Sequence, residues 1–165
     1  MTQITATQVN ELRKQTGAGM MDCKKALTET GGDFEKAIDV LRKKGQKVAA
    51  KRADRDATEG VVLSVVAADG KSGAIICLNC ETDFVAKNDS FVDLANTILM
   101  LALQKKSSDI KEVQELKFDS AMTVNEKLVE QTGVIGEKIA LTSYSIIHAE
   151  CVSAYIHPGN KLASL

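Results

Sequence analysis

Two cysteines three residues apart are the first candidates for chemistry in this 165-residue sequence. Cys77 and Cys80 have the spacing of a zinc-binding or redox pair. No second pair and no nearby histidine completes a ligand set, and residues three apart on a strand point to opposite faces. Packing of Cys77 in a core is therefore the better interpretation, and we predict no metal site.

The other reactive side chains form no recognisable catalytic arrangement. His148 and His157 are the only imidazoles, and neither is followed by residues at the spacing of a nucleophile and its base. The glycine-rich turn at residues 16–19 lacks the preceding strand and the lysine of a phosphate-binding loop. We therefore expect no enzymatic activity, no cofactor and no nucleotide bound directly by this chain.

An apolar ring in a polar connection is a stronger candidate. Residues 79–88, NCETDFVAKN, follow a short apolar strand and precede an amphipathic helix. Phe84 stands in this connection between Asp83 and Lys87, in a chain with four phenylalanines and no tryptophan. Two interpretations remain open: the ring packs back on the following helix as a staple, or it is offered to a partner as a wedge.

The elements on either side position this connection. Residues 74–78, AIICL, have the length and apolar character of a buried strand. Residues 89–104 are predicted to form a helix, with Ser90 as its N-cap and Asp93 at the capping-box position. Its apolar stripe consists of Phe91, Leu94, Ala95, Ile98, Leu99 and Ala102.

The first 45 residues predict a separate bundle of three helices. The first helix ends before Gly17 and Gly19, and residues 20–28 form the second. Asp33 is the N-cap of the third, which is expected to end near Gly45. Of the two adjacent methionines that open the second helix, one is expected to be exposed, because neighbouring positions cannot both face the core.

Charge is unevenly distributed along the chain. Residues 1–59 carry twelve Lys and Arg against nine Asp and Glu, a net +3, and residues 60–165 carry nine against thirteen, a net −4. The total of −1 argues against a dedicated nucleic-acid binder. Residues 46–59 are predicted to form a solvated basic linker, and weak affinity for RNA is the alternative. The basic residues at this join are Lys43, Lys44, Lys47, Lys51, Arg52 and Arg55.

Composition indicates a soluble, globular protein. The chain is 44% hydrophobic and 26% charged, and it has no run of the roughly 18 to 20 apolar residues that span a bilayer. Its start lacks the basic and apolar regions of a secretory leader. Four cysteines without a dense framework favour reduced thiols, so we expect a cytoplasmic protein that does not bind membranes.

The remainder, residues 60–165, predicts an α+β domain rather than repeating βαβ units. Its first two strands form a hairpin that turns at Asp69-Gly70. Leu162–Leu165 starts a further strand that has nothing after it to pair with. The expected elements are strands at 61–67 and 73–79, a helix at 89–104, polar helices at 109–116 and 123–131, and strands at 138–147 and 151–156.

Two motifs resemble the signatures of the elongation factor Ts family, the nucleotide exchange factors of elongation factor Tu. Residues 81–88, ETDFVAKN, are similar to one signature. Leu12-Arg13 followed by residues 16–27, TGAGMMDCKKAL, is similar to the other. The similarity continues through residues 135–137, IGE, to Tyr155 and His157, so it covers essentially the whole chain.

The resemblance also implies a domain organisation. Residues 1–45 would form the three-helix, ubiquitin-associated-like domain found at the start of this family. Residues 60–165 would be the first core subdomain, of the dimerisation type. Members of the family normally continue into a second, related subdomain, so we expect this chain to be truncated at its C-terminal end.

The function implied by the resemblance is nucleotide exchange. The chain would bind elongation factor Tu in its GDP-bound and nucleotide-free states and release GDP by disturbing the Mg²⁺ and phosphate site. Asp83 and Phe84 would intrude beside that site, and His157 would shift the phosphate-binding loop. The partner-binding residues implied are Met20, Met21, Lys24, Thr82, Asp83, Phe84, Val85, Ile135, Gly136 and His157.

Two other functions remain open from the residues alone. A ubiquitin-type binding module on residues 1–45 would need an exposed apolar loop at residues 17–20, and the sequence there, GAGM, fits one. A small enzyme would use Cys80 or Cys151 with a histidine, which requires an unusually reactive thiolate.

Overall fold

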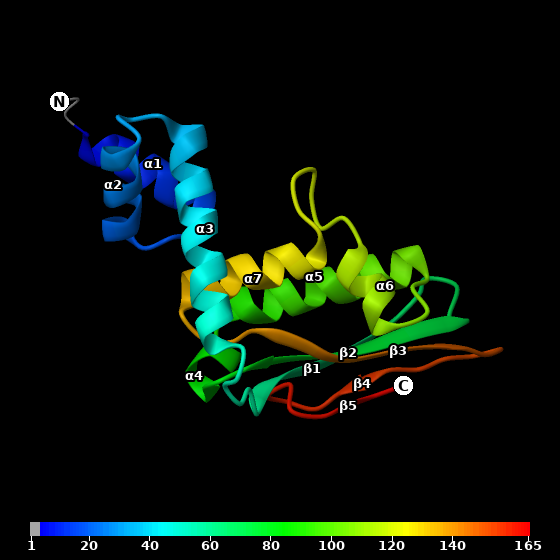
Figure 1. The fold of residues 1–165 in the computed structure, drawn as a ribbon. Helices are drawn as coiled ribbons and strands as arrows, with labels where there is room; N and C mark the ends of the chain where they lie inside the picture. Colours follow the sequence, from blue (N-terminus) through cyan, green and yellow to red (C-terminus); the bar gives the residue numbers. More distant parts are fainter. Residues whose placement is uncertain (1–3) are drawn as a thin grey trace. The chain divides into compact units, whose positions relative to one another are not determined.

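The computed structural model describes residues 4–165, which fall into two compact units. Residues up to 53 and residues 129–136 form the helical unit, whereas residues 54–128 and 137–165 form the sheet unit. Helices come first in the chain, and an antiparallel sheet with further helices follows (Figure 1). The predicted α+β class is therefore confirmed.

Three helices make up most of the helical unit: α1 (Ala6–Thr16), α2 (Met20–Glu29) and α3 (Phe34–Arg52). A capping box starts α1, because the Thr5 hydroxyl accepts from the Gln8 amide at 3.3 Å and the Gln8 side chain accepts from the Thr5 amide at 2.9 Å. The predicted starts of α2 and α3 are confirmed, with Asp33 as the N-cap of α3.

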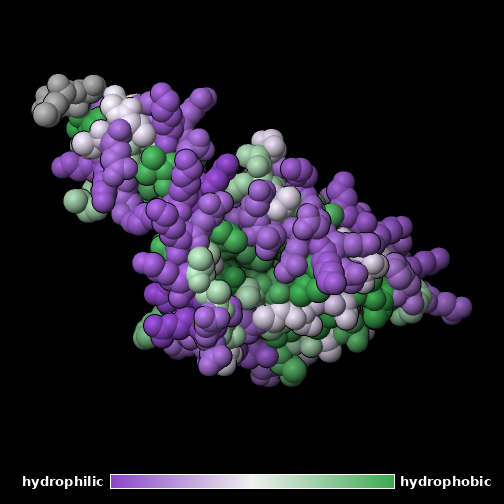
Figure 2. Space-filling model, in the orientation of Figure 1, coloured by the Kyte–Doolittle hydropathy of each residue, from purple (hydrophilic) through white to green (hydrophobic). Residues whose placement is uncertain are grey.

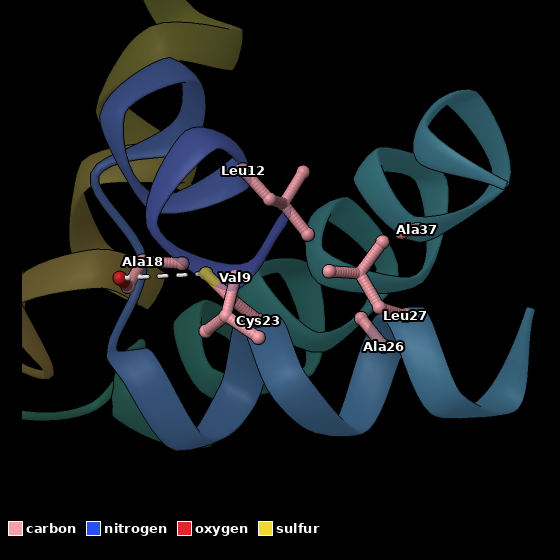
Figure 3. Packing of buried hydrophobic residues seen from close by; sticks show 7 residues of the cluster. All are labelled: Val9, Leu12, Ala18, Cys23, Ala26, Leu27 and Ala37. Atoms are coloured by element: carbon pink, nitrogen blue, oxygen red, sulfur yellow. Dashed lines mark hydrogen bonds between the residues drawn. The ribbon is translucent and has the colours of Figure 1, made fainter. Parts of the chain in front are cut away.

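The core of the helical unit is small and made of short side chains (Figure 3). Leu12 and Leu27 are fully buried, and alanines beside them let the helices approach closely. The buried Cys23 thiol donates to the Ala18 carbonyl at 3.6 Å, which ties α2 to the turn before it. The buried residues are Val9, Leu12, Ala18, Cys23, Ala26, Leu27 and Ala37.

Helix α3 continues beyond its predicted end near Gly45, so residues 46–52 of the expected linker are helical. Glycine usually ends a helix when its φ is positive, but Gly45 keeps helical geometry and is buried. It faces Gly133 of α7 (Val124–Ile135), and a Cβ built at Gly45 would lie 3.7 Å from the Gly133 Cα. Gly45 therefore permits a close helix crossing instead of ending α3.

The sheet unit is built on three antiparallel strands in the order β1-β2-β3: β1 (Glu59–Val66), β2 (Ser72–Cys80) and β3 (Ala140–His148). Val61 lies opposite Leu78, and Leu63 lies opposite Ile76, so one face of the hairpin is continuously apolar. The predicted hairpin and its turn are confirmed.

Helix α5 (Asp89–Lys105) covers this apolar face (Figure 1). Phe91, Ile98 and Leu99 on its stripe are almost completely buried, as their spacing predicts. The N-cap is Asn88 and not Ser90, because the Asn88 side chain accepts from the Ser90 amide at 3.0 Å. The predicted polar helices are present as α6 (Ile110–Glu115) and α7.

The opposite face carries a short hairpin of β4 (Tyr155–Ile156) and β5 (Ala163–Ser164). The prediction that the last residues have no strand to pair with is wrong, because the turn at residues 158–160 folds β5 back on β4. The Ser64 hydroxyl donates to the Tyr155 carbonyl at 3.3 Å and ties this hairpin to β1. The strand predicted at 151–156 shrinks to its last two residues.

The prediction that Cys77 packs in the core is wrong, because Cys80 takes that position. Cys80 points to the same face of β2 as Ile76 and Leu78 and is fully buried, whereas Cys77 lies on the other face and is half-buried. Burial, followed by the neighbouring Glu137 carboxylate, raises the pKa of the Cys80 thiol to about 11. A reactive thiolate at Cys80 is therefore contradicted.

Among residues 4–165, no helix combines the length and apolar character that a bilayer crossing demands.

The glycine crossing predicts an asymmetric response to alanine. A Cβ at Gly133 would collide with the Gly45 Cα, so Gly133→Ala should lower the free energy of unfolding by about 1 to 3 kcal/mol. Gly45→Ala meets only ordinary contacts and gains about 1 kcal/mol of helix propensity, so it should be neutral or stabilising. Urea unfolding followed by circular dichroism measures both, and equal losses would contradict this packing.

The raised pKa of Cys80 predicts slow alkylation. At pH 8 the thiolate fraction of a group with a pKa of about 11 is on the order of 10⁻³, and the side chain is buried as well. Iodoacetamide should therefore modify the exposed Cys151 first and leave Cys80 intact until the chain unfolds. Mass spectrometry of timed digests tests this, and equal labelling of the two residues would refute it.

Candidate functional site

The connection between β2 and α5 contains a helix of one turn, α4 (Asp83–Ala86). Thr82 is its N-cap and accepts from the Val85 amide at 3.5 Å. Phe84 is 82% exposed, so the staple interpretation is wrong. With about 100° between successive residues of a helix, Phe84 points away from the side on which Ala86 is buried, and the ring therefore faces solvent.

An ion pair spans this short helix. The Lys87 ammonium lies 2.6 Å from the Asp83 carboxylate, four residues before it. The hydrogen bond to Lys87 lowers the pKa of Asp83, and the same bond raises the pKa of Lys87. Both groups are therefore charged near neutral pH, and they place a fixed charge pair beside the exposed ring.

Two carboxylates join the start of this connection to the segment before β3. The Glu137 carboxylate accepts from the Thr82 amide at 3.0 Å and from the Thr82 hydroxyl at 2.7 Å. In the reverse direction, the Glu81 carboxylate accepts from the Lys138 amide at 2.6 Å. We call these three hydrogen bonds the carboxylate clasp.

A second link joins β1 to the β4–β5 hairpin. The Lys161 ammonium lies 2.5 Å from the Glu59 carboxylate and also donates to the Gly60 carbonyl at 3.2 Å. Lys161 also contributes to lowering the pKa of Asp83, after the larger effect of Lys87. The positive charge of Lys161 therefore acts on the Asp83 carboxylate in the first turn of the short helix.

His157 stands at the end of β4 and is exposed. Its Nδ1 lies 2.8 Å from the Tyr155 hydroxyl, and the two ring centroids are 6.0 Å apart. The predicted site residues 82–85 and His157 thus all belong to the sheet unit.

The remaining predicted site residues belong to the helical unit. Met20 and Met21 in the first turn of α2 are 51% and 73% exposed, so both are available and not one alone as predicted. Lys24 is exposed one turn further along the same helix. Ile135 ends α7 and is half-buried, and Gly136 after it has a φ of +82°, which favours glycine.

The exposed apolar side chains are unevenly distributed. On the face drawn in Figure 2, hydrophilic residues cover most of the helical unit, and hydrophobic residues gather on the sheet unit. The large apolar residues that remain exposed are Met20, Met21, Phe84, Met100, Ile147, Tyr155, Ile156 and Leu162. Phe84 is the most exposed of these, which marks α4 as the strongest candidate for contact with a partner.

Sequence reasoning did not single out Glu81 and Glu137, whose carboxylates join the connection to the segment before β3. Their hydrogen bonds join residues 55 and 57 positions apart, and no local pattern signals such a pairing. The only signal was the position of each glutamate at the edge of a motif.

Across residues 4–165, the side chains of His, Cys, Asp and Glu form no group of three that could hold a metal ion.

Comparison with known proteins identifies the family. The profile described as Elongation factor TS matches residues 81–165. Elongation factor Ts of Christiangramia forsetii is 57% identical over 100% of this chain and 59% of its own length. The protein of the same name from Rhodopirellula baltica is 54% identical over 100% of this chain and 50% of its own.

A third relative, elongation factor Ts of Amoebophilus asiaticus, is 56% identical over 98% of this chain and 58% of its own length. The chain thus spans between half and three fifths of these relatives. Because the profile covers 85 of the 165 residues, from 81 to 165, the chain belongs to the elongation factor Ts family.

Proposed function

We propose that this chain acts in translation elongation as a guanine nucleotide exchange factor. It binds elongation factor Tu in the GDP-bound and nucleotide-free states and promotes the release of GDP. It forms and breaks no covalent bond, so it is not an enzyme, and it works in the cytoplasm without a cofactor. The nucleotide, and the Mg²⁺ that accompanies it, are held by the GTPase and not by this chain.

The observation that carries this proposal is the 82% exposure of Phe84 on a one-turn helix, within the motif that resembles the family signature. Leaving an aromatic ring in water forgoes about 1.5 to 3 kcal/mol of burial free energy, which a partner can recover on binding. The adjacent Asp83–Lys87 pair supplies charges at the same place. An exposed ring with charges beside it is what we expect of a wedge that enters the GTPase next to its phosphate site.

Binding free energies limit what the wedge can do. If the factor weakens GDP binding, GDP weakens factor binding by the same ratio. A shift of about 10⁴-fold requires about 5.5 kcal/mol, more than one buried phenylalanine contributes. Further contacts are therefore required, and we propose Met20, Met21 and Lys24 in the helical unit.

Thr82, Val85 and His157 complete the proposed contact in the sheet unit. Ile135 and Gly136 complete it in the helical unit. His157 is exposed, and the hydrogen bond between its Nδ1 and the Tyr155 hydroxyl favours one orientation of the ring. These assignments follow the family resemblance, and their exposure or turn geometry is compatible with contact.

Phe84→Ala should slow GDP release at least about tenfold, since the contact loses most of the burial free energy of the ring. The thermal midpoint of the free chain should stay nearly the same, because the residue is 82% exposed and its truncation removes little buried area. Release of a fluorescent GDP analogue from elongation factor Tu, with and without the chain, measures the effect. Met100→Ala, at an apolar position 48% exposed on α5, is the matched control and should leave release unchanged.

Two outcomes would count against the wedge. Unchanged release with Phe84→Ala would exclude a role for the ring. A loss of stability that accounts for the slower release would return the ring to a structural role.

Met21→Ala should weaken binding of elongation factor Tu without changing the release rate at saturation. The side chain lies in the helical unit and is 73% exposed, so its loss removes binding area but leaves α4 untouched. A titration of release rate against chain concentration separates the two effects. Thr28→Ala, on an exposed position of the same helix, serves as the control. A lower saturating rate with unchanged half-saturation would overturn this assignment.

A further inference from the structure

We infer that Glu137 is a positioning residue that fixes the direction in which Phe84 is presented. The inference rests on the proposed function for its consequence in nucleotide exchange. Its structural part, that Glu137 holds α4 in place, can be tested on the free chain.

Thr82 is the residue through which Glu137 acts, and each of its polar groups is engaged. Its amide and hydroxyl donate to the two oxygens of the Glu137 carboxylate, at 3.0 and 2.7 Å. Its carbonyl accepts from the Cys80 thiol at 3.1 Å and from the Ala86 amide at 3.2 Å. Thr82 is therefore fixed on all sides, although it lies in a connection.

Fixing Thr82 also fixes α4. The hydroxyl that donates to Glu137 accepts from the Val85 amide, so one oxygen joins the carboxylate to the helix N-terminus. A helix of four residues has almost no stability of its own, because helix nucleation is unfavourable. Phe84 is 82% exposed, so packing of its ring contributes little to the orientation of α4.

The clasp has a second bond that supports the first. Residues 81 and 82 are neighbours on one segment, and residues 137 and 138 are neighbours on the other. Glu81 accepts from the Lys138 amide, and Glu137 accepts from the Thr82 amide. Two neighbouring residues on each segment are thus joined in both directions. Rotation of either segment would break bonds of both carboxylates, so the clasp resists the motion that would turn α4.

Glu137 supports α4 and does not contact the partner itself. Both oxygens of its carboxylate are used by Thr82, and the residue is half-buried. Hydrogen bonds to a charged acceptor are about twice as strong as those between neutral groups, so the charge as well as the shape of Glu137 matters.

The first test uses the free chain and amide hydrogen exchange followed by NMR. Glu137→Ala should speed the exchange of the Thr82 and Val85 amides at least about tenfold, with Glu137→Gln intermediate. Thr82→Val removes the hydroxyl but keeps the backbone amide that donates to Glu137, so it should speed exchange of the Val85 amide more than that of the Thr82 amide. Thr82→Ser keeps the hydroxyl and should keep both amides protected. Amides of α5 should stay protected in every variant, and Glu150→Gln, on an exposed glutamate, should change nothing.

The second test adds elongation factor Tu carrying fluorescent GDP. Glu137→Ala should lower the saturating release rate about tenfold, because the ring reaches the partner in fewer molecules. A Phe84→Ala, Glu137→Ala double variant should be no slower than Phe84→Ala alone, since both changes remove the same action. Additive losses would show that Glu137 acts apart from the ring and would overturn the inference.

The two tests separate failure of this inference from failure of the proposed function. Unchanged exchange of the Thr82 and Val85 amides in Glu137→Ala overturns the inference even if GDP release slows, because Glu137 would then act by direct contact. Faster amide exchange together with no effect of the wild-type chain on GDP release supports the clasp and refutes the proposed function.

Discussion

The hydrogen bonds between Glu137 and Thr82 are the interaction on which presentation of Phe84 depends. They join residues 55 positions apart, and they act on a helix of one turn that has almost no stability of its own. A connection free to move could gain burial free energy by folding the Phe84 ring back against α5. The carboxylate clasp opposes that movement, so the ring stays in water and this free energy is not gained.

The rest of the sheet unit supports the clasp at both ends. Cys80 ends β2 in the core, and its thiol, protonated near neutral pH, donates to the Thr82 carbonyl and so links the end of the strand to the connection. On the other segment, β3 begins at Ala140, shortly after Lys138, and pairs along β2. Because β2 and β3 are neighbours, the sheet itself brings the two carboxylates together. A rigid scaffold under a functional connection keeps the ordering cost of binding low.

Sequence reasoning found the elements whose signals are local and missed the contacts that only the fold creates. The stripe of α5 and the Asp69-Gly70 turn follow from spacing and turn chemistry, and both are confirmed. Gly45 was misread because a glycine at a helix crossing has the same local pattern as a glycine at a helix end. The exposure of Phe84 could not be decided either, since a staple and a wedge have the same spacing, and the clasp that chooses between them is non-local.

The division of the proposed contacts between two units has a consequence for affinity. Met21 belongs to the helical unit and Phe84 to the sheet unit, and each offers a modest apolar area of its own. Because the two units belong to one chain, binding of one unit raises the effective concentration of the other unit near the partner. Two weak contacts can therefore give a higher overall affinity than either contact alone. Under the proposed function the two units have different roles: contacts on the helical unit contribute to affinity, whereas the sheet unit holds the ring proposed to promote GDP release. Strength of binding and speed of release are therefore able to change independently, because different residues determine them.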